Sequence, residues 1–392
     1  MLAHSPPLPL AIDYFDEDRD ITEDEEEAIL ALKQRDRVHR VRLWTPVTSL
    51  QRLIGAMDEE YPFLEYLIIQ PPLEDRSTIF ILPETLQAPH LRLLSLVGLA
   101  LPIGSRLLTT AVGLVTLGLV MNDPSTYFHP NALLHWLSFM PQLETLAIFF
   151  SFAVPNREIE RQLTHTSIVT IVTLPNLHLF TFRGVSAYLE ALIHQITTPR
   201  LEKLRIYFFN QLTFSVPRLL QFVITTESLR FERADLWFYD ERIYVELYPG
   251  WAAKNPYMYA LSINVDCWHL DWQLSSLSQI FNSLREIFSA VEDLTFGHEE
   301  HSRSSEEHNE VDRIEWRKLL RSFRNVKTLW IDNGLVEQFS RCLRLDDGEP
   351  PLELLPELQE LTYSGSGKSG DAFTSFINAR QNAGRPVTLV HS

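Results

Sequence analysis

The chain contains little cysteine and little positive charge, and it lacks a long hydrophobic run. Its 392 residues include two cysteines, Cys267 and Cys342, too few for the disulfide framework of a small secreted protein. A net charge of −17 argues against binding DNA, RNA or anionic lipid, because phosphate contacts need surplus Lys and Arg. We therefore expect neither nucleic acid nor membrane among its partners.

Targeting segments are also missing. The N-terminus has neither the basic start nor the apolar core of a signal peptide. The most apolar stretch, Leu107 to Met121, is interrupted by Thr and Gly and is shorter than the ~20 residues of a membrane-spanning helix. Together with cysteines that we interpret as reduced thiols, these absences predict a cytoplasmic or nuclear protein.

What the chain does contain is a recurring pattern: Pro, any residue, Leu, two residues, an apolar residue, one residue and a second apolar residue. It starts at Pro62, Pro89, Pro141, Pro175, Pro199, Pro217 and Pro356, and versions without proline start at Leu114, Val291 and Val326. This spacing favours a turn that leads into a short strand with alternate residues facing a core. The proline stands at the strand entrance, where its missing N–H breaks no ladder bond.

Between most of these strands lies a stretch with helical periodicity. The predicted helices are 47–60, 129–139, 186–196, 274–289, 312–323 and 371–382. One strand plus one helix or loop per roughly 23 to 35 residues is typical of a leucine-rich repeat. We therefore predict an α/β fold: an irregular leucine-rich-repeat-like solenoid with a parallel concave sheet and with helices and loops on the convex side. A doubly wound sheet would not keep this repeated pattern.

Three segments depart from the repeat. Residues 1–36 are rich in acids and are predicted to be a solvated lead-in or cap, with one solenoid domain over 37–392. Within that domain, alternating apolar residues in 229–248 predict an inserted hairpin. Residues 298–312 are rich in His, Ser and Glu and predict a mobile loop.

Two segments carry patterns that need chemical scrutiny. Gly365 to Ser369 resembles a phosphate-binding loop, but Thr362 stands where its first glycine would be, so we favour a turn before a helix. His298 and His301 are three residues apart, with His308 nearby, whereas zinc-binding helices space two histidines by four. We therefore expect no cofactor and no metal, and prefer a charged surface loop; phosphorylation in 302–307 stays an alternative.

No nucleophile elbow, redox cysteine pair or paired-carboxylate signature is present. A triad can be assembled from distant residues, so the absence of a motif is only moderate evidence against catalysis. We predict that the chain is not an enzyme, and keep an enzyme with an unrecognised site as an alternative.

The repeat also predicts which side chains line the concave face, because residues between the inward-pointing apolar positions face outward. The predicted partner-binding residues are Tyr66, Phe149, Arg183, Lys203, Arg205, Tyr207, Trp330 and Asp332. The aromatic residues would anchor a protein partner, and the three cations would receive acidic or phosphorylated residues. The alternative is that insertions cover this face and the cations pair with neighbouring acids.

The repeat units resemble those of the F-box/leucine-rich-repeat-like proteins of basidiomycete fungi. The resemblance lies in Met140-Pro141-Gln142-Leu143-Glu144-Thr145-Leu146, in Leu355-Pro356-Glu357-Leu358-Gln359-Glu360-Leu361, in the opening Leu8-Pro9-Leu10 and in the ending Gly384-Arg385-Pro386-Val387-Thr388-Leu389.

The resemblance implies a substrate-recognition arm of a ubiquitin ligase. In that family an N-terminal F-box docks on the ligase adaptor, the repeats present a substrate, and ubiquitin transfer is carried out by partner subunits. An F-box needs apolar-periodic helices, whereas residues 1–36 carry an acidic run, so the F-box is expected to be absent here. A ligase adaptor is therefore expected as a partner only if an F-box is encoded upstream. A ubiquitin-independent scaffolding protein is the alternative.

Overall fold

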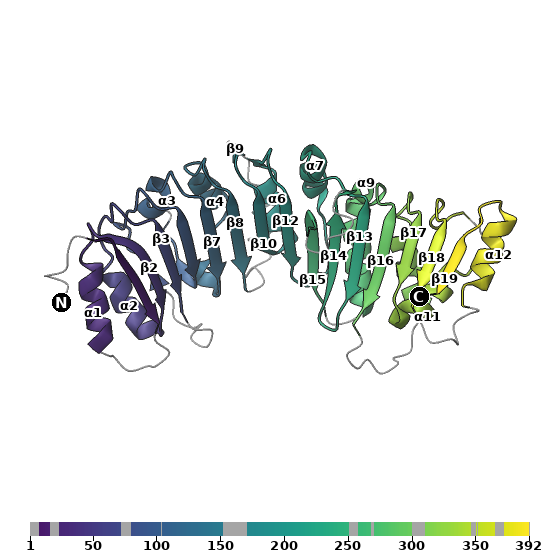
Figure 1. Ribbon diagram of the computed structural model, residues 1–392, viewed down its shortest axis with the longest axis horizontal. Helices are drawn as coiled ribbons and strands as arrows, with labels where there is room; N and C mark the ends of the chain where they lie inside the picture. The colour runs from purple at the N-terminus through teal and green to yellow at the C-terminus, as the bar shows by residue number, and fades with distance from the viewer. Residues whose placement is uncertain are drawn as a thin grey trace. The chain divides into compact units, whose positions relative to one another are not determined.

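The computed structural model describes residues 8–15, 23–71, 80–102, 104–151, 171–250, 258–267, 270–299, 310–345, 350, 352–364 and 372–391. The chain divides into two compact units, residues 1–201 and 202–392. Figure 1 shows that strands lie side by side in each unit. The domain boundary expected between residues 36 and 37 stays a prediction.

The first unit contains a parallel sheet in the order β1-β2-β3-β5-β7-β8-β10. Its strands are β1 (Leu10–Phe15), β2 (Val38–Trp44), β3 (Tyr66–Gln70), β5 (Leu93–Val97), β7 (Thr116–Met121), β8 (Thr145–Phe150) and β10 (Leu179–Gly184). Two short pairs accompany it: β4 (Phe80–Ile81) with β6 (Leu99–Ala100), and β9 (Val172–Thr173) with β11 (Ile196–Thr197).

Helices connect the strands of the first unit: α1 (Glu23–Leu32), α2 (Val47–Gly55), α3 (Arg106–Thr110), η2 (Pro124–Thr126), α4 (Pro130–Leu137) and α6 (Ser186–Ile193). The acidic segment that was predicted to be a solvated lead-in or cap contributes both β1 and α1. Glu25 of α1 is fully buried; it accepts a hydrogen bond from Ser49 Oγ at 2.7 Å and pairs with Arg52 of α2 at 2.6 Å. One acid of that run therefore fastens α1 to α2.

The second unit contains a mixed sheet in the order β12-β15-β14-β13-β16-β17-β18-β19. Its strands are β12 (Lys203–Phe208), β13 (Arg233–Phe238), β14 (Arg242–Tyr248), β15 (Leu261–Asp266), β16 (Asp293–His298), β17 (Thr328–Ile331), β18 (Glu360–Tyr363) and β19 (Thr388–His391). β13 and β14 form an antiparallel hairpin within the stretch where alternation predicted one. β14 pairs antiparallel with β15, and the other pairings are parallel.

The helices of the second unit are α7 (Pro217–Thr225), α8 (Leu270–Ser283), α9 (Arg285–Phe288), α10 (Glu310–Leu320), η4 (Asn333–Leu335), α11 (Val336–Leu343) and α12 (Thr374–Asn382). Arg380 of α12 is fully buried and donates to the carbonyl oxygens of Leu355, Pro356 and Leu358 at 3.0 to 3.2 Å. This arginine fastens the last helix to the turn before β18.

The predicted α/β solenoid with its largely parallel sheet is confirmed, but one predicted strand is wrong. Pro217 to Ile224 forms the helix α7, with Pro217 in its first turn. Leu219, Phe222 and Val223 are buried at helical spacing, while Ile224, a core position in the strand interpretation, is 49% exposed. The same Pro-x-Leu-x-x-Phe letters fit both periods over such a short run, and proline favours the first turn of a helix.

The core of each unit lies between its sheet and its helices. Phe150 of β8 contacts Tyr188 of α6 with ring centroids 4.8 Å apart. In the second unit, Phe296 of β16 packs at 5.7 Å from Trp316 of α10 and at 4.7 Å from Phe339 of α11. Every second strand residue therefore faces helices, and the residues between them lie on the opposite side of the sheet, which we call the open face.

Candidate functional site

All eight predicted partner-binding residues occupy non-core positions of the strands or their ends. Tyr66, Phe149, Lys203, Arg205, Tyr207 and Trp330 alternate with buried residues of β3, β8, β12 and β17, and Asp332 directly follows β17. Arg183 alternates with Phe182 and Gly184 in β10 of the first unit, whereas Lys203 and Arg205 belong to β12 of the second. Partner binding by these residues stays a prediction.

The open face of the first unit has a central row of mostly small side chains. Strand register aligns Ile68, Ser95, Gly118, Ala147 and Thr181 on β3, β5, β7, β8 and β10. Larger residues flank this row, among them Phe149 of β8, which stands opposite Val120 and Arg183. Along its middle, the open face of the first unit therefore carries mostly short side chains and few polar groups.

Aromatic residues collect on the first three strands, β1 to β3. Phe15 of β1 and Trp44 of β2 are register partners with ring centroids 6.2 Å apart. The guanidinium of Arg42 lies 5.0 Å from the centroid of the Phe15 ring. Tyr66 of β3 is 36% exposed, and its ring centroid lies 6.0 Å from that of the His39 ring. This end of the sheet presents aromatic faces and cationic groups together.

The open face of the second unit is built differently, from hydrogen-bonded polar side chains. Arg233 and Asp235 of β13 form a two-pronged ion pair, with Nε to Oδ1 at 2.9 Å and Nη2 to Oδ2 at 2.7 Å. Asp235 is 4% exposed. On β14, the Tyr248 hydroxyl donates to Glu246 at 2.7 Å, and the Arg233 guanidinium lies 5.1 Å from the Tyr248 ring. These groups hold one another in place.

Glu246 stands opposite Asp235 on one side and Ser262 of β15 on the other. Burial raises the pKa of Glu246, and the nearby Asp235 charge raises it further, while the Tyr248 hydrogen bond and the arginines Arg205 and Arg233 oppose the shift. Burial also raises the pKa of Tyr248, helped by its hydrogen bond to Glu246. The phenol therefore remains a donor at neutral pH.

The predicted residues Arg205 and Tyr207 border this cluster. Their register partners on β15 are Ser262 and Asn264, which are both buried. Asn264 donates to Ser262 Oγ at 3.1 Å, and its Oδ1 accepts no hydrogen bond from the residues that the structure describes. The Arg205 guanidinium lies 5.4 Å from the Tyr259 ring. Arg205 is thus already engaged by an aromatic neighbour rather than projecting freely.

Farther along, β13 and β16 meet at Trp237 and Gly297. These two are register partners, and a Cβ at Gly297 would overlap the Trp237 ring. The absence of a side chain on Gly297 thus makes room for the indole. Trp330 of β17 stands between Thr295 and Thr362 in the register of the neighbouring strands.

A cavity of about 420 Å³ opens beside Trp237. Its lining residues are Trp237, Tyr239, His298, Glu299, Asp332 and Asn333. Asp332 Oδ1 accepts hydrogen bonds from the Asn333 backbone N–H at 2.8 Å and from Ser364 Oγ at 3.1 Å, and Oδ2 accepts from the His298 N–H at 3.4 Å. We call these six residues the aromatic–acidic pocket; Asp332 is its one member among the predicted site residues.

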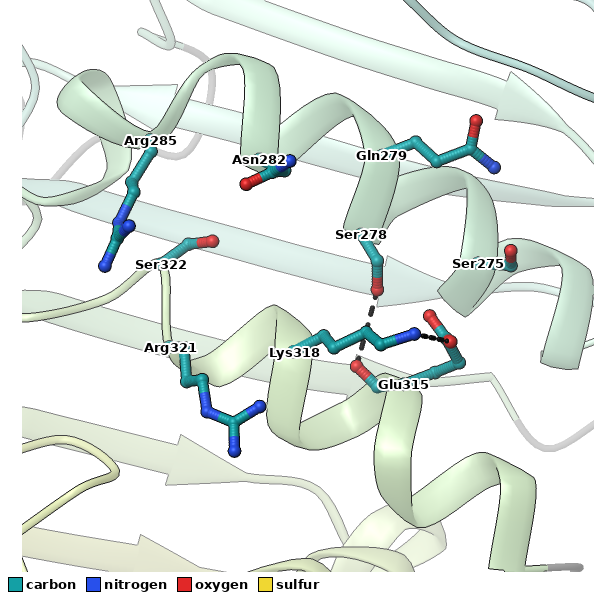
Figure 2. A pocket seen from close by; sticks show the side chains of 9 residues that line it. All are labelled: Ser275, Ser278, Gln279, Asn282, Arg285, Glu315, Lys318, Arg321 and Ser322. Carbon is teal, nitrogen blue, oxygen red and sulfur yellow. Dashed lines mark hydrogen bonds and ion pairs between the residues drawn. The ribbon is translucent and has the colours of Figure 1, made fainter.

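A second cavity, of about 460 Å³, lies on the helical side between α8 and α10, and Figure 2 shows the side chains around it. Lys318 pairs with Glu315 at 2.6 Å, and Ser278 Oγ donates to the Glu315 carbonyl at 3.4 Å. Arg321 pairs with Glu353 at 2.6 Å. Lys318 and Arg321 are thus paired with neighbouring acids. We interpret the residues around this cavity as contacts that hold neighbouring helices together.

The two chemical motifs weighed in the sequence fall largely outside the described residues. Residues 365–369 are not described, nor are residues 300–309, which include His301 and His308 and make up most of the loop predicted over 298–312. The ends of that predicted loop are not loop: His298 is the last residue of β16, and α10 begins at Glu310. Within the described ranges, no group of three or more His, Cys, Asp or Glu residues could hold a metal ion. Over the same ranges, no helix is both long and apolar enough to cross a bilayer.

Sequence reasoning missed the hairpin as a source of site residues. Asp235, Trp237 and Glu246 alternate with apolar residues, so their outward direction could have been read from the sequence. The sequence could not show that they lie beside Ser262 and Gly297, because the strand order β15-β14-β13-β16 in the sheet differs from the order along the chain.

No family model matches the chain, and no curated protein does. Seven chains of solved structures match it, among them the crystal structure of the leucine-rich repeat-containing protein LegL7 from Legionella pneumophila. That match has 10% sequence identity, covers 97% of this chain and 99% of that chain, and has a TM-score of 0.30. The fold assignment therefore stands on the strand pairing and burial within this chain itself.

Proposed function

We propose that the chain is a protein-binding repeat module with no catalytic activity of its own, whose partner contacts the open faces of its sheets. The observation that carries this proposal is the polar and aromatic surface of β12 to β17. There, Arg233, Asp235, Glu246 and Tyr248 are held in fixed positions by mutual hydrogen bonds before any partner arrives. Such preorganisation lowers the entropy that binding must overcome.

Side-chain type supports a protein as the ligand. Tyr207, Trp237 and Trp330 are half-buried aromatic residues around this polar cluster. Large aromatic groups and arginines beside polar neighbours are the residue types that dominate the energetics of protein interfaces.

Site-specific photo-crosslinking tests the proposal. A benzophenone amino acid would replace Tyr207 or Trp330 on the open face, and Trp272 on α8 would serve as the control because it is aromatic and 55% exposed on another surface. We expect the same partner to be crosslinked from both open-face positions and not from Trp272. Crosslinking from Trp272 alone would show that the helical side is the binding surface.

The finer proposal is that this module is the substrate-recognition arm of an F-box-type ubiquitin ligase receptor. It is supported by the resemblance of the repeat units to the basidiomycete proteins alone, since no family model and no curated protein matches the chain. Co-purification of the full-length gene product with a ligase adaptor tests it. Partner crosslinking without any adaptor would favour the scaffolding alternative.

The predicted role of the cations has its own test. Charge reversal at Lys203 and Arg205, which lie half-buried on β12, should weaken capture of a partner that presents acidic residues there, and circular dichroism checks that each variant is folded. Arg183 is varied separately because it belongs to the other unit. Unchanged capture in all variants would exclude these cations from the interface.

A further inference from the structure

The aromatic–acidic pocket combines two aromatic side chains with two carboxylates in a single cavity of about 420 Å³. One wall is Trp237, whose ring takes the space left by Gly297. The other ring belongs to Tyr239, which contacts Tyr244 edge-on with centroids 5.1 Å apart. Both rings are thus positioned by neighbours in the same sheet.

The backbone that carries Tyr239 is also held. Gln273 of α8 is fully buried, and its Nε2 donates to the carbonyl oxygens of Tyr239 and Cys267 at 2.8 Å each. Burial raises the pKa of Tyr239, and the charge of Glu299 adds to the shift. The phenol therefore stays neutral at neutral pH, beside a carboxylate.

Among the residues that the structure describes, no cation pairs with either carboxylate. Asp332 accepts hydrogen bonds from neutral donors, and Glu299 is exposed at the end of β16. Neither forms an ion pair with any residue that the structure describes. Two negative charges beside two electron-rich rings produce a local field that attracts a cation.

We propose that the aromatic–acidic pocket binds the guanidinium group of an arginine side chain presented by the protein partner. This inference rests on the proposed protein-binding function and specifies what the partner offers at this point. A guanidinium is planar, stacks on Trp or Tyr rings, and donates several hydrogen bonds to a carboxylate at once. The net charge of −17 favours approach of a basic segment.

An arginine suits the pocket better than a lysine for the same reasons. An ammonium is compact and strongly hydrated, and it lacks the planar fork that stacks on a ring while donating hydrogen bonds to a carboxylate. A lysine probe is therefore expected to bind more weakly, and the test includes it.

Fluorine NMR of protein labelled with 5-fluorotryptophan tests the proposal at the pocket itself. The chain has eight tryptophans, and the resonances of Trp237 and Trp272 are assigned by their loss in Trp237→Phe and Trp272→Phe. The probes are N-acetyl-arginine amide, its lysine analogue and its citrulline analogue, which keeps the shape of arginine without the charge.

We expect the arginine probe to shift the Trp237 resonance saturably and to leave the Trp272 resonance unchanged. Removing the charge should weaken binding about tenfold, because one cation–π contact with a charge-assisted hydrogen bond contributes about 1.4 kcal/mol. In the Asp332→Asn and Glu299→Gln double variant, arginine should bind no better than citrulline does to the unmodified protein. Asn keeps the acceptor that caps Asn333, so the pocket remains folded.

Equal shifts with arginine and citrulline, or no shift of Trp237 at tens of millimolar arginine, would overturn the proposal. Tighter binding of the lysine probe would overturn the choice of arginine. The crosslinking experiment separates this failure from that of the general function: a crosslinked partner without arginine binding sinks only the pocket assignment. Arginine binding without any crosslinked partner sinks the protein-binding function.

Discussion

In both units alternate strand residues face the core, but the open faces carry different side chains. In the first unit the middle row runs through Ser95, Gly118 and Ala147, which carry almost no side chain. In the second unit the corresponding surface holds the Arg233–Asp235 ion pair and the Tyr248–Glu246 hydrogen bond. The comparison shows that the repeat constrains inward positions and leaves outward positions available for specialisation.

This difference has an energetic side. Small residues on the open face can be exchanged at little cost, because few neighbours depend on them. Buried polar residues depend on one another, since removal of one partner leaves the other without compensation. Substitutions at matched positions should therefore cost more in the second unit than in the first.

The largest effect is expected for Asp235→Ala. This substitution leaves the Arg233 guanidinium without the carboxylate that it pairs with. It should lower the free energy of unfolding of the second unit by about 2–3 kcal/mol. This range is below that for a fully buried pair because the Arg233 side chain is one-third exposed. Ser95→Ala in the first unit is the control, with a change within about 0.5 kcal/mol. Denaturant unfolding measures both, and equal losses would break the comparison.

A smaller effect is expected from a pair of glycine substitutions. Gly297→Ala forces its new methyl group into the Trp237 ring and should cost about 1–2 kcal/mol as the indole shifts. Gly118→Ala meets its nearest neighbour, Ser95 Oγ, at 3.5 Å, which is ordinary contact, so it should be tolerated. Thermal unfolding together with the Trp237 fluorine resonance reports the two outcomes. A destabilised Gly118→Ala with an unaffected Gly297→Ala would contradict the assigned packing.

The smallest effect is a pH dependence. Because the folded-state pKa of Glu246 is raised, the folded protein holds this proton more tightly than the unfolded chain. Its contribution to stability is present below the ordinary glutamate pKa and is lost as pH rises through the raised value. Glu246→Gln should remove this loss of stability with rising pH, because glutamine has no proton to release. Unfolding free energies measured from pH 4 to 7 would show an unchanged slope if Glu246 were not responsible.

Much of the candidate surface could be anticipated from the sequence. Strand alternation placed Tyr66, Phe149, Tyr207 and Trp330 outside the core, and burial in the structure agrees. The same reasoning placed Asp332 correctly but gave no reason to connect it with Trp237 or Glu299. Those residues come from separate strands, and only their packing shows that they line one cavity.

The sequence by itself determined which residues of each repeat face the core, because a period of two assigns alternate side chains without knowledge of any neighbour. It did not determine whether Pro217 begins a strand or a helix, since both periods fit so few residues. The tertiary structure alone decided that β14 and β15 lie between β12 and β13. Cross-strand neighbours, and hence the ion pairs and the aromatic–acidic pocket, depend on sheet order, which local periodicity does not encode.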